Sequence, residues 1–338
     1  MEQQAIITVK DLRTYFYSDK RCNKVLNGVS FELYKGRTLC VVGESGCGKS
    51  VTASSIMQLL PKLSRIESGA ITYHSEKGDI RIDQLPRNGK EMRALRGRDI
   101  AMIFQDPMTA LNPVYTIGFQ IGEDLKYHTD LDKRSRRART LELLTQMGIS
   151  TPEKRIDQYP HEFSGGMRQR AMIAMAMSCS PKVLIADEPT TALDVTIQAD
   201  IIDLLKDIQK EFGMAVIMIT HDLGIVANIA KKIIVMYAGK VVETGSSQDI
   251  FYRPRHPYTK ALLRAVPRLD TEEEQSLESI EGTPPNMIDP PAGCAFSTRC
   301  SQCMRICQKS EPPMFEFEDG HTAQCWLYHP MAAQGNEE

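Results

Sequence analysis

The sequence lacks long apolar runs, and its positive and negative charges nearly cancel. No apolar stretch approaches the roughly 18 residues that a membrane-spanning helix needs. Residues 1–9 lack the basic start and the long apolar segment of a secretion signal. The formal net charge is −2, from 41 basic and 43 acidic residues, which gives no electrostatic reason to expect a nucleic-acid-binding protein. We therefore expect a cytoplasmic protein that reaches a membrane only through a partner.

The sequence also lacks any long-period internal repeat, which argues against an array of similar units. Its 338 residues exceed one typical domain, and 42% of them are hydrophobic. This composition is that of an ordinary soluble protein with a sizeable core. We expect one large domain with an appendage.

Strand-like and helix-like segments alternate along most of the chain. The strand-like segments are residues 6–16, 28–33, 38–42, 183–186 and 215–220, and the helix-like ones are 51–60, 123–147 and 198–212. Strands that alternate with helices predict an α/β fold with a largely parallel sheet that is covered on both faces. The basic run within residues 133–137 is interpreted as a solvated helix face.

Residues 43–50 match the phosphate-loop pattern G-x-x-x-x-G-K-[ST] in full, between a strand and a helix. They are Gly43, Glu44, Ser45, Gly46, Cys47, Gly48, Lys49 and Ser50. The glycines let the backbone curl so that its N–H groups face phosphate oxygens at a helix N-terminus. Lys49 would then reach the β- and γ-phosphates, and the Ser50 hydroxyl would bind Mg²⁺.

Two adjacent carboxylates, Asp187 and Glu188, end the apolar strand at residues 183–186. Because the carboxyl ends of parallel strands face the ligand crevice, Asp187 can hold Mg²⁺ through water. Glu188 can polarise the attacking water. The sequence therefore predicts an ATPase.

Further motifs resemble those of the ATP-binding cassette (ABC) family, and they follow in that family's order. They are Phe16; Gln105 before Asp106 and Pro107; Phe163, Ser164, Gly165, Gly166, Met167, Arg168 and Gln169; Thr191, Ala192, Leu193 and Asp194; and His221. The signature departs from the usual Leu-Ser-Gly-Gly-Gln at Phe163 and Met167. The resemblance implies a P-loop ABC nucleotide-binding domain with a mixed core sheet, RecA-like helices, a β-rich N-terminal layer and a helical subdomain.

The resemblance also implies a role for each of these positions. Phe16 would stack on adenine, with Tyr15 and Tyr17 as alternatives. Val51 would join the phosphate loop in binding nucleotide, while Ser164, Gly165, Gly166, Met167 and Asp194 would serve the ATP of a second cassette. Glu188, His221 and Gln105 would be catalytic, and Ser50, Gln105 and Asp187 would bind Mg²⁺. Since the chain holds one cassette, a partner cassette would close face to face on ATP and separate after hydrolysis.

Cys47 within the phosphate loop allows two interpretations. The simpler one is a small residue that the loop tolerates. The other is an accessible thiol with a pKa lowered by Lys49 and a helix N-terminus, so that MgATP would protect it from alkylation.

The end of the chain resembles the C-terminal region of ATPases in the dipeptide/oligopeptide importer group. The resemblance rests on His256, Pro257, Tyr258 and Thr259 and on four cysteines, Cys294, Cys300, Cys307 and Cys325. It implies a [4Fe–4S] cluster on these cysteines, with zinc or free thiols as alternatives and Cys303 as a bystander. The expected organisation is an ABC domain (1–266, helical subdomain about 108–170), a linker (267–290), a cysteine-rich extension (291–330) and a tail (331–338).

The function that we expect is the ATP-hydrolysing motor of a peptide importer at the cytoplasmic face of the cell membrane. Its implied partners are a second ATPase, which would form a heterodimer, two permeases and an extracytoplasmic solute-binding protein, with no nucleic acid. An importer of a nickel–chelate, a glycoside or an antimicrobial peptide is the alternative. An ABC ATPase acting on DNA or ribosomes is disfavoured because the chain lacks a long coiled-coil insertion and a second cassette.

Overall fold

The structure, a computed structural model, describes residues 4–18, 21–191, 193–265 and 280–332. The chain forms two compact units, each built from separate stretches of sequence. The first unit comprises Met1–Ile7, Leu33–Thr38 and Tyr73–Ile219, and the second comprises Thr8–Glu32, Leu39–Thr72 and Thr220–Glu338. Among the described helices, none has the length and apolar character that crossing a membrane requires.

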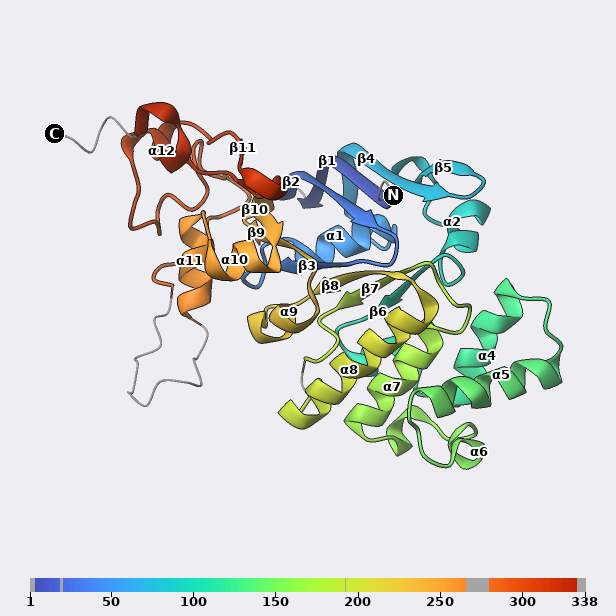
Figure 1. Cartoon of the computed structure of the whole chain (residues 1–338). Coiled ribbons are helices and arrows are strands. Elements are labelled where there is room, and N and C mark those ends of the chain that lie inside the picture. Colours follow the sequence, from blue (N-terminus) through green and yellow to red (C-terminus); the bar gives the residue numbers. More distant parts are fainter. Residues whose placement is uncertain (1–3, 19–20, 192, 266–279, 333–338) are drawn as a thin grey trace, which may run out of the picture. The chain divides into compact units, whose positions relative to one another are not determined.

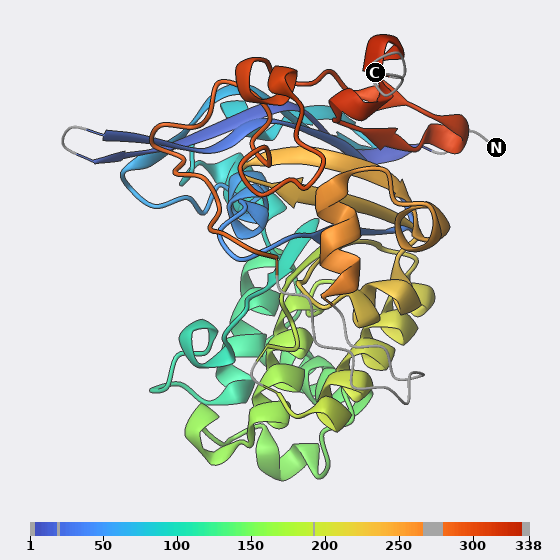
Figure 2. The ribbon, with the colours of Figure 1, turned by 90° about the vertical axis from the view of Figure 1, so that its left-hand side faces the viewer.

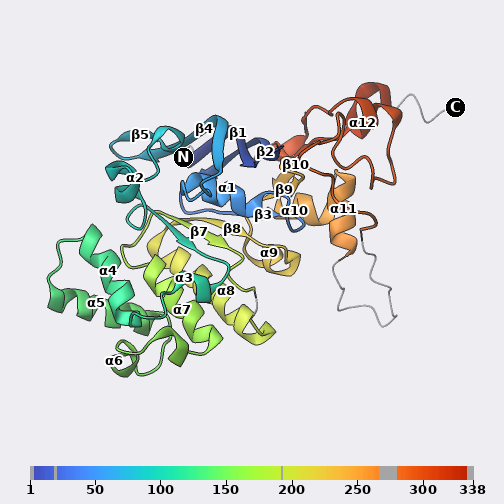
Figure 3. The same cartoon turned by 180° about the vertical axis from the view of Figure 1, so that it is seen from behind.

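The first unit is built around three parallel strands, β6 (Ile100–Ile103), β7 (Val183–Asp187) and β8 (Ala215–Ile219). All three strands are buried along their whole length, as their continuous apolar sequences predict. Helices α7 (Gly165–Ala176) and α8 (Val195–Phe212) lie along this group of strands (Figure 3). Parallel order brings the carboxyl ends of the strands to one edge.

The other elements of the first unit are mostly helical and precede α7 in sequence. They are β5 (Gly78–Arg81), η1 (Ile82–Gln84), α2 (Lys90–Leu95), α3 (Pro107–Ala110), α4 (Ile117–His128), α5 (Lys133–Gln146), α6 (Pro152–Arg155) and η2 (Pro160–Glu162). The single helical stretch predicted over residues 123–147 is in fact two helices, α4 and α5. The Asp132 side chain accepts a hydrogen bond from the Ser135 N–H at 2.8 Å and so starts α5 as a new helix.

The second unit contains most of the N-terminal β layer, where β1 (Ala5–Ser18) lies between β2 (Arg21–Tyr34) and β4 (Ser64–Ser75). This confirms the strands predicted at residues 6–16 and 28–33, which extend further than expected. Helix α1 (Lys49–Ile56) ends earlier than the predicted residue 60, because Gln58 takes a left-handed backbone conformation with φ 51°.

The second unit also contains β3 (Thr38–Val42), which runs parallel to β9 (Lys232–Tyr237), and β10 (Lys240–Ser246), which is antiparallel to β9. The helices of this part are α9 (Leu223–Ile229), α10 (Ser247–Tyr252) and α11 (Pro257–Arg264). Figure 1 shows α10 and α11 next to β9 and β10.

The C-terminal extension adds to the same sheet of the second unit. Its short strand β12 (Thr322–Ala323) pairs with β10, and β11 (Phe315–Glu316) pairs with β12. Its other elements are α12 (Arg305–Lys309), η3 (Glu318–Gly320) and η4 (Trp326–Tyr328). The extension, in red, lies beside the orange strands in Figure 2. Residues 267–279 of the expected linker and 333–338 of the expected tail lie outside the described residues.

Candidate nucleotide-binding and hydrolysis site

The phosphate loop, residues 43–50, lies between β3 and α1 of the second unit, as the sequence predicts. Gly43 and Gly48 have φ angles of 150° and 105°, which side chains rarely allow. A Cβ atom on Gly43 would meet the Met236 carbonyl oxygen at 2.2 Å, and one on Gly48 would meet Leu26 at 2.7 Å. Both glycines are therefore required by the path of the loop.

Lys49 is buried, and its ammonium group points back over the loop. The Nζ atom donates to the carbonyl oxygens of Gly43 at 2.8 Å and Glu44 at 3.1 Å. Ser45, Gly46 and Ser50 are exposed at the same loop. This arrangement leaves an accessible loop surface beside a positioned cation, which suits an anionic phosphate group.

Cys47 is buried, with 5% of its surface exposed. Burial raises the pKa of its thiol, although the nearby Lys49 ammonium lowers that pKa in part. Its backbone also forms a tertiary contact, since the Cys47 carbonyl oxygen accepts a hydrogen bond from the Gly239 N–H at 3.0 Å. These observations favour the simpler interpretation, a small residue within the loop, over a reactive thiol.

His221 and Phe16 come from segments that lie close to the phosphate loop and α1 in the second unit. The Thr220 N–H bonds to the Val41 carbonyl oxygen at 3.3 Å, so the residue before His221 lies beside the strand that enters the loop. The Thr14 and Ser55 hydroxyls are 3.0 Å apart, which joins β1 to α1. Because alternate residues of a strand share a face, Phe16 is on the α1 side with Thr14.

The same alternation separates Phe16 from Tyr15 and Tyr17. The Tyr17 hydroxyl donates to Glu67 at 2.6 Å, and the Arg65 guanidinium lies 4.7 Å from the Tyr17 ring centre. The Tyr17 side chain therefore contacts residues of β4. Of the three aromatic residues, Phe16 is the one that shares the face of Thr14 and α1.

Glu188 follows β7 in the first unit, and its carboxylate is held by two neighbours. Glu188 Oε2 accepts hydrogen bonds from Gln105 Nε2 at 3.1 Å and from Thr191 Oγ1 at 3.0 Å. Its backbone is in the left-handed region, with φ 47°, and its N–H donates to the Ile219 carbonyl oxygen at 2.9 Å. Asp187, just before it, is buried at the end of β7. This conformation is uncommon for a residue other than glycine, and here it accompanies a carboxylate fixed by two side-chain hydrogen bonds.

The signature turn begins α7 in the first unit. Ser164 caps this helix by accepting a hydrogen bond from the Met167 N–H at 3.3 Å. A Cβ atom on Gly166 would lie 3.1 Å from Ile197 in α8, so glycine allows the turn to approach this helix closely. Asp194 is the N-terminal cap residue of that same helix. The signature turn and the predicted dimer-contact loop are thus neighbours.

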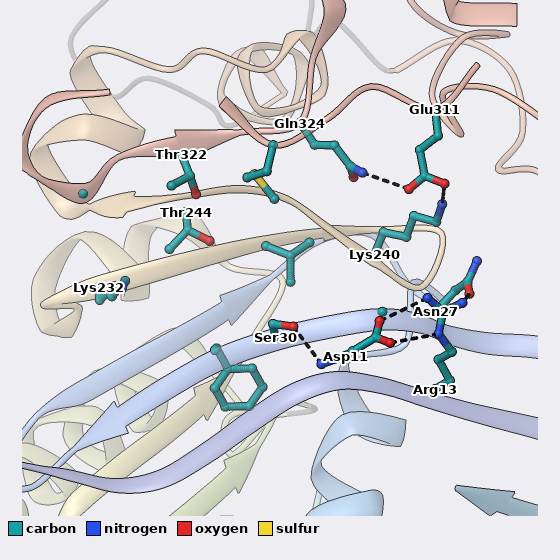
Figure 4. Close-up of a pocket in the computed structure, with 15 residues that line it drawn as sticks. Asp11, Arg13, Asn27, Ser30, Lys232, Lys240, Thr244, Glu311, Thr322 and Gln324 are labelled. Carbon is teal, nitrogen blue, oxygen red and sulfur yellow. Dashed lines mark hydrogen bonds and ion pairs between the residues drawn. The ribbon is translucent and has the colours of Figure 1, made fainter. Parts of the chain in front are cut away.

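A cavity of about 470 Å³ lies elsewhere in the second unit, between β1, β2, β10 and the extension (Figure 4). Four of its five charged side chains are paired, Asp11 with Arg13 and Lys240 with Glu311, and the fifth is Lys232. The Gln324 amide also donates to Glu311 at 2.9 Å. Most polar groups of this cavity therefore serve packing between segments, and we assign it no ligand.

The cysteines of the extension influence one another electrostatically. Burial raises the pKa of Cys294 to about 11 and that of Cys325 to about 12, and repulsion from Cys300 and Cys307 adds to both shifts. Burial also raises the pKa of Cys300 and of Cys303. In the part of the chain that the structure describes, no group of three or more His, Cys, Asp or Glu side chains is arranged to hold a metal ion.

Three contacts were not expected from the sequence. Thr191 bonds to Glu188, and Tyr258 and Arg299 both bond to Glu44 of the phosphate loop. All three residues lie within or beside segments that the sequence motifs had already identified. The pattern of the sequence could locate these segments but could not show which residues contact the site.

Two family models match the chain. The model described as "ABC transporter" matches residues 26–191, and the model described as "Oligopeptide/dipeptide transporter, C-terminal region" matches residues 242–307. The chain is 51% identical to the dipeptide transport ATP-binding protein of Bacillus subtilis (strain 168), over 97% of this chain and 96% of that protein. It is 48% identical to a dipeptide transport ATP-binding protein of Haemophilus influenzae, over 98% of each chain.

Solved structures show the same fold. An ATP-binding cassette in a dimeric post-hydrolysis state with ADP and Pi is 26% identical, with a TM-score of 0.63, and the match covers 71% of this chain and 98% of that one. The protein cbiO1 from Clostridium perfringens, part of the ABC transporter complex cbiONQ, is 27% identical, with a TM-score of 0.61, and the match covers 75% of this chain and 92% of that one. From these matches and the geometry above, the chain is an ATPase of the ABC transporter family and belongs to that family's dipeptide/oligopeptide importer group.

Proposed function

We propose that this chain binds MgATP on its phosphate loop and uses Glu188 as the base that activates water. The observation that carries this proposal is the Glu188 carboxylate, which two hydrogen bonds hold at the carboxyl edge of parallel strands. A general base must be held in a defined orientation to accept a proton. Gln105 and Thr191 supply that orientation within the first unit.

The remaining site residues have proposed roles around the nucleotide. Ser50, Gln105 and Asp187 would bind Mg²⁺, directly or through water, and the ion would neutralise charge on the phosphates. Phe16 would stack on adenine, and His221 would contact the γ-phosphate. Lys49, already positioned over the loop, would exchange its carbonyl partners for phosphate oxygens.

We propose that two cassettes close around ATP, each adding its signature turn to the other's nucleotide. Ser164, Gly165, Gly166, Met167 and Asp194 would form this contribution. The similar cassette that was solved as a dimer with ADP and Pi supports the arrangement. A heterodimer with a second ATPase of the same group is the form that we favour.

The proposed membrane partners are two permeases, with an extracytoplasmic solute-binding protein. Large apolar side chains are exposed close to Gln105 in sequence, namely Phe104, Met108, Val114, Tyr115 and Phe119. Tyr115 and Phe119 stack with ring centres 4.6 Å apart. An exposed apolar group of this kind is typical of a protein interface. Docking there would hold the chain peripherally at the cytoplasmic face of the membrane.

Peptides are the solutes that we propose for the complete transporter. The support is that relatives about half identical over nearly the whole chain are dipeptide and oligopeptide transport ATP-binding proteins. The alternatives are a nickel–chelate, a glycoside or an antimicrobial peptide. Uptake assays with the complete transporter would separate them, since a labelled dipeptide should enter vesicles and nickel should not.

We also propose that Cys294, Cys300, Cys307 and Cys325 hold a [4Fe–4S] cluster, with zinc as the alternative. The support is that the Cys294 N–H donates to the Cys307 carbonyl oxygen at 2.7 Å, which brings two of the four residues together, and that four cysteine thiolates suit such a cluster. Anaerobically purified protein should then contain about four irons per chain and absorb near 400 nm, a typical cluster band. Stoichiometric zinc without iron would establish the alternative.

The decisive test of the ATPase site is Glu188→Gln in the purified transporter. We expect nucleotide binding to persist and turnover to fall by roughly 100-fold or more, because the amide cannot accept the proton. Glu211→Gln on the exposed end of α8 is the matched control and should hydrolyse ATP normally. Normal turnover by Glu188→Gln would refute the assignment of the base.

A further inference from the structure

The C-terminal extension contacts the phosphate loop through a bidentate ion pair between Arg299 and Glu44. Arg299 Nη1 donates to Glu44 Oε2 at 2.7 Å, and Arg299 Nη2 donates to Glu44 Oε1 at 3.0 Å. The two residues are 255 positions apart in the sequence, and both belong to the second unit. Parallel paired hydrogen bonds of this kind fix the orientation of both partners.

Every N–H donor of the Arg299 guanidinium has an acceptor. Nη1 also donates to the Tyr237 hydroxyl at 3.3 Å, Nη2 to the Ile280 carbonyl oxygen at 2.9 Å, and Nε to the Glu281 carbonyl oxygen at 2.9 Å. The Arg299 side chain is 3% exposed and that of Glu44 is 26% exposed. The hydrogen bonds to Glu44 raise the pKa of Arg299 further above its usual range. This ion pair is therefore largely shielded from solvent, unlike the surface pairs that contribute little.

A second contact holds the backbone of the same residue. The Glu44 N–H donates to the Tyr258 hydroxyl at 2.8 Å. Tyr258 is completely buried, and its ring packs against Tyr237 and Phe296 with centres 4.6 Å and 5.3 Å away. The side chain and the backbone of Glu44 are thus both held by residues that follow the cassette motifs in the sequence.

We propose that the C-terminal region holds the phosphate loop in its nucleotide-binding shape, with Arg299 and Tyr258 as positioning residues. Glu44 lies between Gly43 and Gly46, whose φ angles of 150° and 79° are open to glycine, so the intrinsic preferences of the backbone do not fix this part of the loop. A loop that samples other shapes binds its ligand more weakly, in proportion to the time it spends in the competent shape. The proposal rests on the assignment of residues 43–50 to the phosphates.

The test is a double-mutant cycle on the full-length protein, with MgADP binding measured by titration calorimetry. Arg299→Ala should raise the Kd of MgADP by about tenfold, since a charge-assisted hydrogen-bond pair is lost. Glu44→Ala should raise the Kd by a similar factor. In the Glu44→Ala background, Arg299→Ala should change the Kd very little further. Arg299→Lys keeps the charge but not the paired geometry and should give an intermediate Kd.

Stability is followed separately through Trp326, the only tryptophan of the chain, which lies in the extension. Should Arg299→Ala unfold the extension, Glu44→Gln tests the same contact without altering the extension and should also weaken MgADP binding. Arg305→Ala, at an exposed arginine of α12, is the matched control and should bind MgADP normally. In the assembled transporter, the KM for ATP should rise more than kcat falls.

The outcomes separate this inference from the proposed site. Equal effects of Arg299→Ala in the wild-type and Glu44→Ala backgrounds would show that Arg299 acts independently of the loop, which overturns the inference. Normal MgADP affinity in Arg299→Ala and Glu44→Gln overturns it as well, provided that Lys49→Ala abolishes binding. Unchanged affinity in Lys49→Ala would instead overturn the assignment of the phosphate loop itself.

Discussion

His256 should make the second unit sensitive to mild acid. Its imidazole is 1% exposed, and Nδ1 accepts a hydrogen bond from the Tyr258 N–H at 3.1 Å, which caps α11. Burial lowers the pKa of His256 from 6.5 to about 3. In the native protein the ring therefore stays neutral at pH 5, whereas in the unfolded chain it takes up a proton below pH 6.5.

The sign and size of the effect follow from this difference in proton binding. Between pH 6.5 and pH 3 the unfolded state binds more protons than the native state, so the free energy of unfolding falls as the pH falls. For a single histidine the loss between pH 7 and pH 5 is about 2 kcal/mol. This figure depends little on the native pKa, provided that the pKa stays below 4 or so.

The assay is urea unfolding at pH 7, 6 and 5, monitored by the fluorescence of Trp326. His256→Asn keeps an acceptor for the Tyr258 N–H and removes the titrating ring, so the comparison of variant and wild type isolates this one group. Between pH 7 and pH 5, the free energy of unfolding of the wild type should fall by about 2 kcal/mol more than that of the variant. Equal losses in the two proteins would refute the reasoning.

Three further predictions concern a buried ion pair, a hydrogen bond to Glu188 and the burial of Cys47. His321→Ala should lower the free energy of unfolding by about 2–3 kcal/mol in the same assay, because His321 Nε2 lies 2.7 Å from a carboxylate oxygen of the completely buried Glu243; a loss below about 1 kcal/mol would contradict this. Thr191→Val should reduce ATP turnover by about tenfold at unchanged MgADP affinity, because it removes one hydrogen bond to Glu188; an altered Kd would point to a different role. Iodoacetamide should modify the partly exposed Cys22 before Cys47, as peptide mass spectrometry would show, and faster labelling of Cys47 would contradict its burial.

Local sequence patterns were sufficient for β1, β2, β3, β7, β8 and the phosphate loop, whereas β4, β6, β9 and β10 were not among the predicted segments. The strands at residues 38–42, 183–187 and 215–219 are apolar apart from Thr38 and Asp187, and near-continuous apolar runs of this kind are typical of buried parallel strands. The phosphate loop depends on glycines at fixed offsets, so its path is encoded within eight residues. The boundary between α4 and α5 was missed, because Asp132 caps a helix within a polar stretch that has no stronger break.

The sequence by itself thus determined the motifs that identify the chain as an ATPase of the ABC family, since each lies on one strand end, one turn or one helix start. Only the tertiary structure decided what holds those motifs in place. The hydrogen bonds of Gln105 and Glu188 join residues 83 apart, and Arg299 and Tyr258 reach Glu44 from 255 and 214 residues away. Contacts of that separation depend on how distant segments pack, and no local periodicity records them.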